Sequence, residues 1–195
     1  ELSNLMFLDL SNNNLDGILP QEIFSMETLL GFNLSHNSLT GGIPEELGSL
    51  TNLMSMDLSH NQLSGTLPSS IGNMTGLVEI SLDHNQLSGE LPFEIGQLLF
   101  LSEFHANDNQ FTGIITYNIC ESGIAFNNPL NFNIGNNSFC PPYPDCMEAF
   151  IGNQEIAECQ GVFELFDSLY YADDVLELDL SNSGITGSIS QNIGN

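Results

Sequence analysis

Residues 53–76 read LMSMDLSHNQLSGTLPSSIGNMTG, and the same arrangement of apolar and amide residues recurs along most of the chain. The asparagine within this stretch belongs to a series in which each member follows the last by 24 residues: Asn13, Asn37, Asn61, Asn85 and Asn109. An apolar residue recurs five positions before each asparagine, and a leucine or phenylalanine recurs two positions after it. A fixed period of this length indicates stacked repeats, because one unit cannot bury its own apolar face.

The first half of each repeat predicts a short strand. In the first repeat Leu8 and Leu10 alternate with Phe7, Asp9 and Ser11, which is the two-residue period of a half-buried strand. The leucines should point into the core, and the alternate residues should form the exposed face of a concave parallel sheet. The repeated asparagine should turn inward and satisfy backbone groups of neighbouring coils. This structural role is expected at Asn13, Asn37, Asn61, Asn85, Asn109 and, in a sixth repeat, Asn137.

The second half of each repeat carries the step Leu-x-Gly-x-Ile/Leu-Pro, at residues 15–20, 39–44, 63–68 and 87–92, followed by pairs such as Leu47-Gly48 and Ile71-Gly72. On these motifs the chain resembles the plant-type leucine-rich repeat family over residues 2–119, and again over 175–195. The family includes ectodomains of plant receptor kinases and polygalacturonase inhibitors, and related secreted surface proteins of bacteria. The resemblance implies an α/β solenoid, a right-handed superhelix with a concave parallel β-sheet.

The spacing of the repeats predicts three segments. Residues 1–139 form a block of about six leucine-rich repeats, with a four-residue insertion near residues 120–128 because Asn137 follows Asn109 by 28 positions. Residues 140–174 lose the leucine pattern and should form a cap-like insert. Within it, residues 161–171 place apolar side chains at helical spacing, which predicts a short amphipathic helix. Residues 175–195 restore the pattern and predict a further repeat.

All four cysteines lie between residues 120 and 159: Cys120, Cys140, Cys146 and Cys159. An even, clustered number of cysteines favours two disulfides and an oxidising compartment. The alternative is a zinc site, although these spacings contain no C-x-x-C motif. Four cysteines permit three pairings, and the sequence does not choose among them.

The chain contains 25 Asp and Glu residues and no Lys or Arg, a formal charge of −25. Nucleic acid is excluded as a partner, since phosphate binding needs basic side chains. No apolar run reaches the roughly 20 residues that span a bilayer, so no membrane span is expected. The acidic surface either serves only to keep the protein solvated or attracts Ca²⁺ and cationic partners.

A partner would touch the exposed positions of the predicted strands. These positions are small, polar and acidic, with few aromatic side chains, so a solvated sheet face is the alternative to a binding surface. The residues predicted to contact a partner are Phe7, Asp9, Asp57, Glu79, Glu103 and His105.

Three histidines immediately precede the repeated asparagine: His36, His60 and His84. Their spacing should place them about 5 Å apart on neighbouring strands, where they could bind a transition metal or respond to pH. The alternative is that they fill a variable exposed position, since Asn12, Asp108 and Asn136 occupy it elsewhere. Asn107-Asp108-Asn109 and Asp83 add oxygen ligands, and weakly bound Ca²⁺ is the only cofactor expected.

Asn-x-Ser/Thr sequons occur at Asn33, Asn73 and Asn136 and predict N-glycosylation in a glycosylating host. No nucleophile elbow, H-E-x-x-H motif or P-loop is present, so catalysis is not expected.

The predicted function is a secreted, extracellular recognition or adhesion scaffold that binds protein or glycan at the cell surface. The alternative is a structural subunit of a filament or tandem array. Residues 193–195 lead in phase into residues 1–5, so solenoids could stack head to tail.

Overall fold

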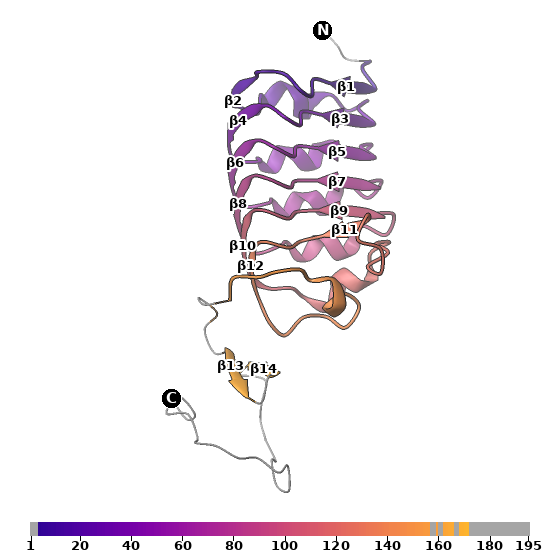
Figure 1. The fold of residues 1–195 in the computed structure, drawn as a ribbon. Coiled ribbons are helices and arrows are strands. Elements are labelled where there is room, and N and C mark those ends of the chain that lie inside the picture. Colours follow the sequence, from indigo (N-terminus) through magenta and orange to yellow (C-terminus); the bar gives the residue numbers. More distant parts are fainter. Residues whose placement is uncertain (1–3, 157–158, 160–161, 166–167, 172–195) are drawn as a thin grey trace, which may run out of the picture.

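The computed structural model describes residues 4–156, 159, 162–165 and 168–171, and Figure 1 shows a stack of coils of nearly equal size. Each coil contains a front strand, a back strand and, where the chain returns to the next coil, a short 3-10 helix (Figure 1). The molecule is therefore a solenoid, and its core runs along the axis of the stack.

The front strands form one parallel sheet in the order β1-β3-β5-β7-β9-β11. Leu8 of β1 pairs with Phe32 of β3, and Phe32 pairs with Met56 of β5, so identical positions of successive coils share a register. The strands are β1 (Phe7–Asp9), β3 (Gly31–Asn33), β5 (Ser55–Asp57), β7 (Glu79–Ser81), β9 (Glu103–His105) and β11 (Phe132–Asn133).

A second parallel sheet, in the order β12-β10-β8-β6-β4-β2, was not predicted from the sequence. Its strands are β2 (Asp16–Ile18), β4 (Ser38–Gly41), β6 (Gln62–Gly65), β8 (Gln86–Gly89), β10 (Gln110–Ile114) and β12 (Ser138–Cys140). Gln, Ser and Gly are weak strand formers in sequence, and stacking of the coils is what aligns them. The motif glycine in this strand has a φ of 75–80° at Gly17, Gly41, Gly65, Gly89 and Gly113, a conformation that a residue with a Cβ rarely adopts.

The side opposite the front sheet consists of 3-10 helices. Each helix begins directly after the last residue of the Leu-x-Gly-x-Ile/Leu-Pro motif, which is a proline in the first four repeats and Thr116 in the fifth. They are η1 (Gln21–Ser25), η2 (Glu45–Ser49), η3 (Ser69–Asn73), η4 (Phe93–Gln97) and η5 (Tyr117–Glu121). Each turns an aliphatic side chain such as Leu47 or Ile71 fully into the core. Glycines allow the helices to pack closely, since a Cβ on Gly48 would lie 2.5 Å from the backbone oxygen of Ser70 in the next coil.

The repeated asparagines join the coils. The side-chain oxygen of Asn61 accepts a hydrogen bond from the Leu39 backbone N–H in the preceding coil at 3.0 Å. Its side-chain nitrogen donates to the carbonyl oxygens of Leu34 in the preceding coil and of Leu58 in its own. Asn37, Asn85, Asn109 and Asn137 make the same set of bonds to their own coil and the preceding one.

One further member of this row had not been predicted from the sequence. Gln154 donates to the carbonyl oxygens of Ile134 and Ile151 and accepts from the Phe139 backbone N–H at 3.1 Å. These are the bonds that an asparagine would make in a seventh coil, yet Gln154 follows Asn137 by only 17 residues. The segment that follows β12, which includes η6 (Glu148–Phe150), is thus a shortened last coil.

This last coil closes one end of the core. Met147 is fully buried, and Tyr143, Cys146 and Ile151 pack against the core cluster. The Tyr143 hydroxyl donates to the Phe139 carbonyl oxygen at 3.0 Å, and burial raises the pKa of this hydroxyl. Residues 141–155 therefore cover this end of the described core, and we call them the cap. The cap-like insert predicted over residues 140–174 stays a prediction.

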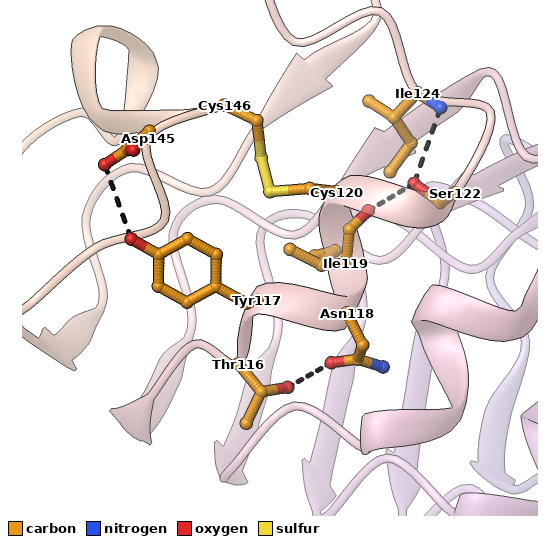
Figure 2. The surroundings of a disulfide bond; sticks show 9 residues. All are labelled: Thr116, Tyr117, Asn118, Ile119, Cys120, Ser122, Ile124, Asp145 and Cys146. Carbon is orange, nitrogen blue, oxygen red and sulfur yellow. Dashed lines mark hydrogen bonds between the residues drawn. A yellow bond between two sulfur atoms is a disulfide. The ribbon is translucent and has the colours of Figure 1, made fainter.

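Two disulfides fasten the cap. Cys120 pairs with Cys146 and Cys140 with Cys159, with Cα–Cα distances of 6.0 and 5.6 Å. Figure 2 shows the first bridge between η5 and the cap. The Tyr117 hydroxyl of η5 also reaches the cap, where it lies 3.4 Å from Asp145 Oδ1. All four cysteines are thus used in disulfides, and the alternative of a zinc site is wrong.

The amphipathic helix predicted over residues 161–171 is also wrong. The chain instead forms two antiparallel strands, β13 (Val162–Leu165) and β14 (Ser168–Tyr171), in which Val162 pairs with Tyr171. Short apolar runs satisfy helix and strand patterns equally well, and Val, Phe and Tyr favour strands. The further repeat predicted at 175–195 lies outside the described residues. Within the described part of the chain, no helix is long and apolar enough to cross a membrane.

Replacement of Asn61 by alanine removes side-chain bonds to two coils and leaves buried backbone groups without partners. We expect Asn61→Ala to lower the free energy of unfolding by about 2–4 kcal/mol. The matched control is Asn13→Ala, because among the described residues the Asn13 side chain donates to Leu10 and Ser11 of its own coil and to no other coil, and we expect a loss below about 1 kcal/mol. Urea denaturation followed by circular dichroism measures both, and equal losses would contradict the inter-coil role.

Gln154 supplies a second test of the same interaction. We expect Gln154→Ala to cost about 1–3 kcal/mol, because the Phe139 N–H and the Ile134 carbonyl lose their partner. Asn153→Ala should have little effect, since Asn153 accepts from Asn136 through its backbone oxygen, which alanine retains. The same denaturation experiment applies, and a stable Gln154→Ala protein would show that the short coil is held by its disulfides alone.

Candidate functional site

The front sheet carries a shallow hollow of about 450 Å³ that extends from β1 to β9. Five of the six residues predicted to contact a partner line it: Phe7, Asp9, Asp57, Glu79 and Glu103. The sixth, His105, lies on β9 of the same sheet but does not line the hollow. Side chains that are distant in sequence meet here because the coils stack in register.

An exposed aromatic ring marks one end of the hollow. Phe7 on β1 is 67% exposed. Its ring lies over Gly31, where an added Cβ would come within 3.1 Å of Phe7 Cδ1. The glycine in β3 therefore leaves room for the ring to lie against the sheet.

Carboxylates line the rest of the hollow. Asp57 is oriented by Ser59, whose backbone N–H and hydroxyl both donate to Asp57 Oδ1, at 3.0 and 2.7 Å. Glu79 accepts from the Ser55 hydroxyl at 3.0 Å. Hydrogen bonds from Ser11 lower the pKa of Asp9. With no Lys or Arg in the chain, this surface is strongly negative at neutral pH.

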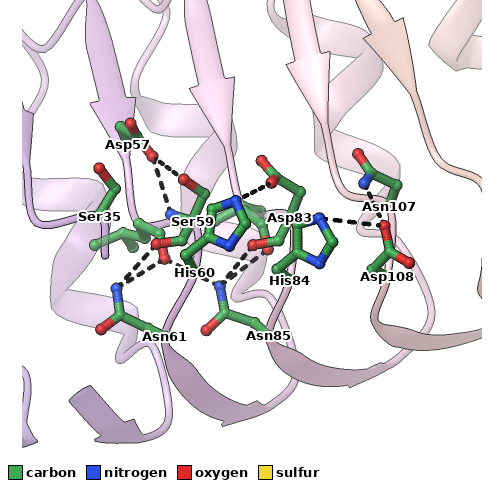
Figure 3. Close-up of polar contacts among 12 residues, drawn as sticks. Ser35, Asp57, Ser59, His60, Asn61, Asp83, His84, Asn85, Asn107 and Asp108 are labelled. Atoms are coloured by element: carbon green, nitrogen blue, oxygen red, sulfur yellow. Dashed lines mark hydrogen bonds and ion pairs between the residues drawn. The ribbon is translucent and has the colours of Figure 1, made fainter. Parts of the chain in front are cut away.

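A second group of side chains lies at the end of the front strands. The imidazoles of His36 and His60 stack with ring centroids 4.1 Å apart, and those of His60 and His84 stack at 4.3 Å. His60 Nε2 lies 3.6 Å from Asp83 Oδ2, and His84 Nε2 lies 3.6 Å from Asp108 Oδ2 (Figure 3). We call His36, His60, His84, Asp83 and Asp108 the histidine–aspartate column.

The backbone explains why histidines occupy this position. All six residues that precede the row asparagines have a positive φ of 52–55°: Asn12, His36, His60, His84, Asp108 and Asn136. Asn, Asp and His tolerate this left-handed conformation better than other residues with a side chain. The position is therefore restricted to a few residue types, a constraint that the sequence-based view of a variable exposed position missed. Its signal was that only Asn, Asp and His occur there.

The electrostatics of the column differ along its length. Partial burial, followed by the neighbouring His84 and His36, lowers the pKa of His60, although Asp83 and Asp57 oppose this effect. Amide groups of Asn107 and Asn136 donate to the two carboxylate oxygens of Asp108 at 2.6 and 2.7 Å. The Asn107 hydrogen bond is the main cause of the lowered pKa of Asp108. The lowered pKa of His60 favours a neutral imidazole at neutral pH, and its Nε2 lies 3.6 Å from Asp83 Oδ2.

The other predicted oxygen ligands have different environments. Asn109 uses its side chain in the asparagine row, and Asn107 donates to Asp108. Calcium binding at Asn107-Asp108-Asn109 stays a prediction.

Among the sequons, Asn73 is exposed at the end of η3. Asn33 accepts from Ser35, and Asn136 donates to Asp108. Glycosylation at these three positions also stays a prediction.

Comparison with known proteins identifies the type of repeat. A model of the leucine-rich repeat matches residues 4–26, 28–50, 52–74 and 76–98. No curated protein sequence gives a significant match. These four matches, the two parallel sheets and the asparagine row show that the described coils are leucine-rich repeats of the plant type.

Solved structures with the same fold include plant receptor ectodomains. The Arabidopsis receptor kinase HAESA, in complex with the peptide hormone IDA and the co-receptor SERK1, is 31% identical with a TM-score of 0.71, over 80% of this chain and 27% of that one. The ectodomain of GASSHO1/SCHENGEN3 from Arabidopsis thaliana, in complex with CASPARIAN STRIP INTEGRITY FACTOR 2, is 31% identical with a TM-score of 0.66, over 71% and 16% of the two chains.

A shorter neighbour is the BIR2 ectodomain from Arabidopsis thaliana, which is 29% identical with a TM-score of 0.61 over 70% of each chain. The chain spans between 16% and 27% of the length of the first four receptor structures that it matches.

Proposed function

We propose that this protein is a non-catalytic, extracellular recognition scaffold and that the front-sheet hollow binds a peptide or an extended protein segment with basic and apolar side chains. The observation that carries the proposal is the lining of the hollow, where one exposed aromatic ring stands beside four carboxylates. The two disulfides support an oxidising, extracellular location.

The geometry suits an extended ligand. Phe7 on β1 and Glu103 on β9 belong to the same row of paired residues across the front sheet, so the hollow crosses five strands. Neighbouring strands lie about 4.8 Å apart, which makes the hollow roughly 20 Å long, comparable to six extended residues at about 3.3 Å each. An apolar ligand side chain would pack on Phe7, and Lys or Arg would pair with Asp57, Glu79 and Glu103.

The receptors with known structures support this class of ligand. HAESA is in complex with a peptide hormone, and PEPR1 is in complex with AtPEP1. A glycan partner has weaker support, because sugar rings stack on exposed aromatic faces. Of the two phenylalanines that line the hollow, Phe32 is buried and Phe7 alone is exposed.

The proposal predicts the behaviour of charge-neutralising variants. Short random peptides selected on the full chain should be enriched in Lys, Arg and apolar residues. The triple variant Asp57→Asn, Glu79→Gln and Glu103→Gln should weaken binding of a selected peptide by about tenfold or more, because buried or central charge pairs dominate such interfaces.

The matched control removes three charges from the helical side: Glu22→Gln, Glu46→Gln and Glu94→Gln. It should change affinity by less than about twofold at fixed ionic strength, since distant surface charges are screened. Isothermal titration calorimetry measures both variants. Equal weakening by the two variants would show that peptide binding depends only on the net charge of the protein, and it would contradict a front-sheet site.

Self-association through the first coil is the second candidate function, and one observation favours it. The first coil exposes apolar residues whose equivalents in later coils are buried: Leu10 and Leu15 are each 38% exposed, whereas Leu58 and Leu63 are fully buried. Ile18 on β2 is 70% exposed. An open sheet edge beside apolar side chains favours the addition of another strand. At the other end, the cap covers the core of the described coils and opposes direct stacking there.

Sedimentation velocity over a wide range of protein concentration tests this alternative. If the first coil is a self-association surface, the wild-type protein should form larger species as concentration rises, and Ile18→Glu should keep it monomeric. Leu99→Glu is the control, because Leu99 is 65% exposed in the connection after η4, away from the first coil. A wild-type protein that is monomeric at all concentrations would reject the alternative.

A further inference from the structure

We propose that His60, Asp83 and His84 form a binding site for a divalent transition-metal ion of the zinc class. This proposal is independent of the peptide-binding function. It places the site on the histidine–aspartate column, at the edge of the front sheet, and assigns one nitrogen from each histidine and one carboxylate oxygen from Asp83 as ligands.

The distances among the three groups support the proposal. One ligand atom from each of His60, Asp83 and His84 lies within 4.8 Å of the others. In a tetrahedral zinc site, bonds of about 2.0–2.2 Å place the ligand atoms about 3.3–3.6 Å apart. The 3.6 Å distance between His60 Nε2 and Asp83 Oδ2 already approaches this value. The third ligand atom lies within 4.8 Å of these two, so a side-chain rotation would have to close the remaining gap when the ion binds.

Backbone bonds between the coils hold the ligands in place. The His60 N–H donates to the Asp83 carbonyl oxygen at 2.9 Å, and the His84 N–H donates to the Asn107 carbonyl oxygen at 3.0 Å. The asparagines that follow both histidines belong to the row that joins the coils. The site therefore needs little ordering when the ion binds, which favours affinity.

The chemistry of the donor set selects the ion. Two imidazoles and one carboxylate suit Zn²⁺ and its neighbours, whereas Ca²⁺ takes six to eight oxygen ligands. The side chains of His60 and His84 are 40% and 47% exposed, so an ion and its remaining water ligands can reach them. The net charge of −25 raises the local concentration of cations around the chain.

Sequence differences between the coils explain why the proposed site forms at His60, Asp83 and His84 and not elsewhere in the histidine–aspartate column. Asp83 stands where Ser11, Ser35 and Ser59 stand in the preceding coils. The residue next to His36 in the following coil is thus Ser59, which offers no carboxylate. Asp108 stands beside His84, but the amides of Asn107 and Asn136 already donate to both of its oxygens. Its role is to orient His84 from outside the set of ligands.

The experiment measures Zn²⁺ binding to the full chain by calorimetry, at constant ionic strength and neutral pH. We expect one saturable site in the wild-type protein. His60→Asn, His84→Asn and Asp83→Asn should each weaken binding at least about tenfold. Asparagine occurs naturally at Asn12, Asn136 and Asn107, the equivalent positions of other coils, so these variants preserve the backbone conformation.

Two controls separate the site from general attraction of cations. His105→Asn should leave Zn²⁺ affinity unchanged, because His105 lies on β9 outside the column. His36→Asn should have a smaller effect than His60→Asn. Binding of Co²⁺ should give the visible absorption of a protein-bound ion in the wild-type protein, with loss of this signal in His60→Asn.

Three outcomes would overturn the proposal: Zn²⁺ binding that does not saturate, binding that is equal in all variants, or displacement of Zn²⁺ by equimolar Ca²⁺. Loss of Zn²⁺ affinity and of the Co²⁺ signal in the three ligand variants, with retention in His105→Asn, supports it.

Discussion

The hydrogen bonds of the asparagine row are the interaction on which the rest of this structure depends. A parallel coil that turns at the end of its front strand leaves backbone N–H and carbonyl groups inside the stack, where water cannot reach them. One amide per coil satisfies groups of two coils at once, so each coil is complete only when its neighbour is present. The leucine core supplies most of the favourable free energy, but an aliphatic core alone would tolerate sliding of one coil against the next. The amides fix the register.

A fixed register has a direct consequence for function. Each position of the repeat becomes a column of side chains about 4.8 Å apart, and any departure from the consensus changes that column at one defined height. Phe7 above Gly31, and Glu79 beside Glu103, are departures of this kind on the front sheet. Asp83 is another, since it places a carboxylate beside a column of histidines. The surface of the solenoid is thus specified coil by coil, without any change in the core.

The sequence could predict the parts of the fold that follow from the period. The front strands, the inward leucines and the asparagine row follow from the 24-residue spacing, and clustering of the cysteines indicates the cap. Other features depend on contacts that no local pattern contains. The back sheet arises because stacking aligns weak strand formers such as Gln62 and Ser64. Gln154 replaces an asparagine at a spacing of 17 residues, and only the geometry of the short coil identifies it. The strands β13 and β14 occupy a segment whose apolar spacing also fits a helix.

The candidate sites show the same division. Sequence spacing could place five lining residues of the hollow on one face, because they occupy equivalent strand positions. It could not show that the exposed Phe7 ring lies against the sheet, since this depends on a glycine in the adjacent coil. It could align the three histidines, yet the reason for their presence lies in the backbone. A left-handed residue must precede each row asparagine, and only Asn, Asp and His occur there in this chain. The requirement that orients the asparagines therefore also brings three of the four histidines into a stack, in a chain that has no Lys or Arg to set against its 25 Asp and Glu residues.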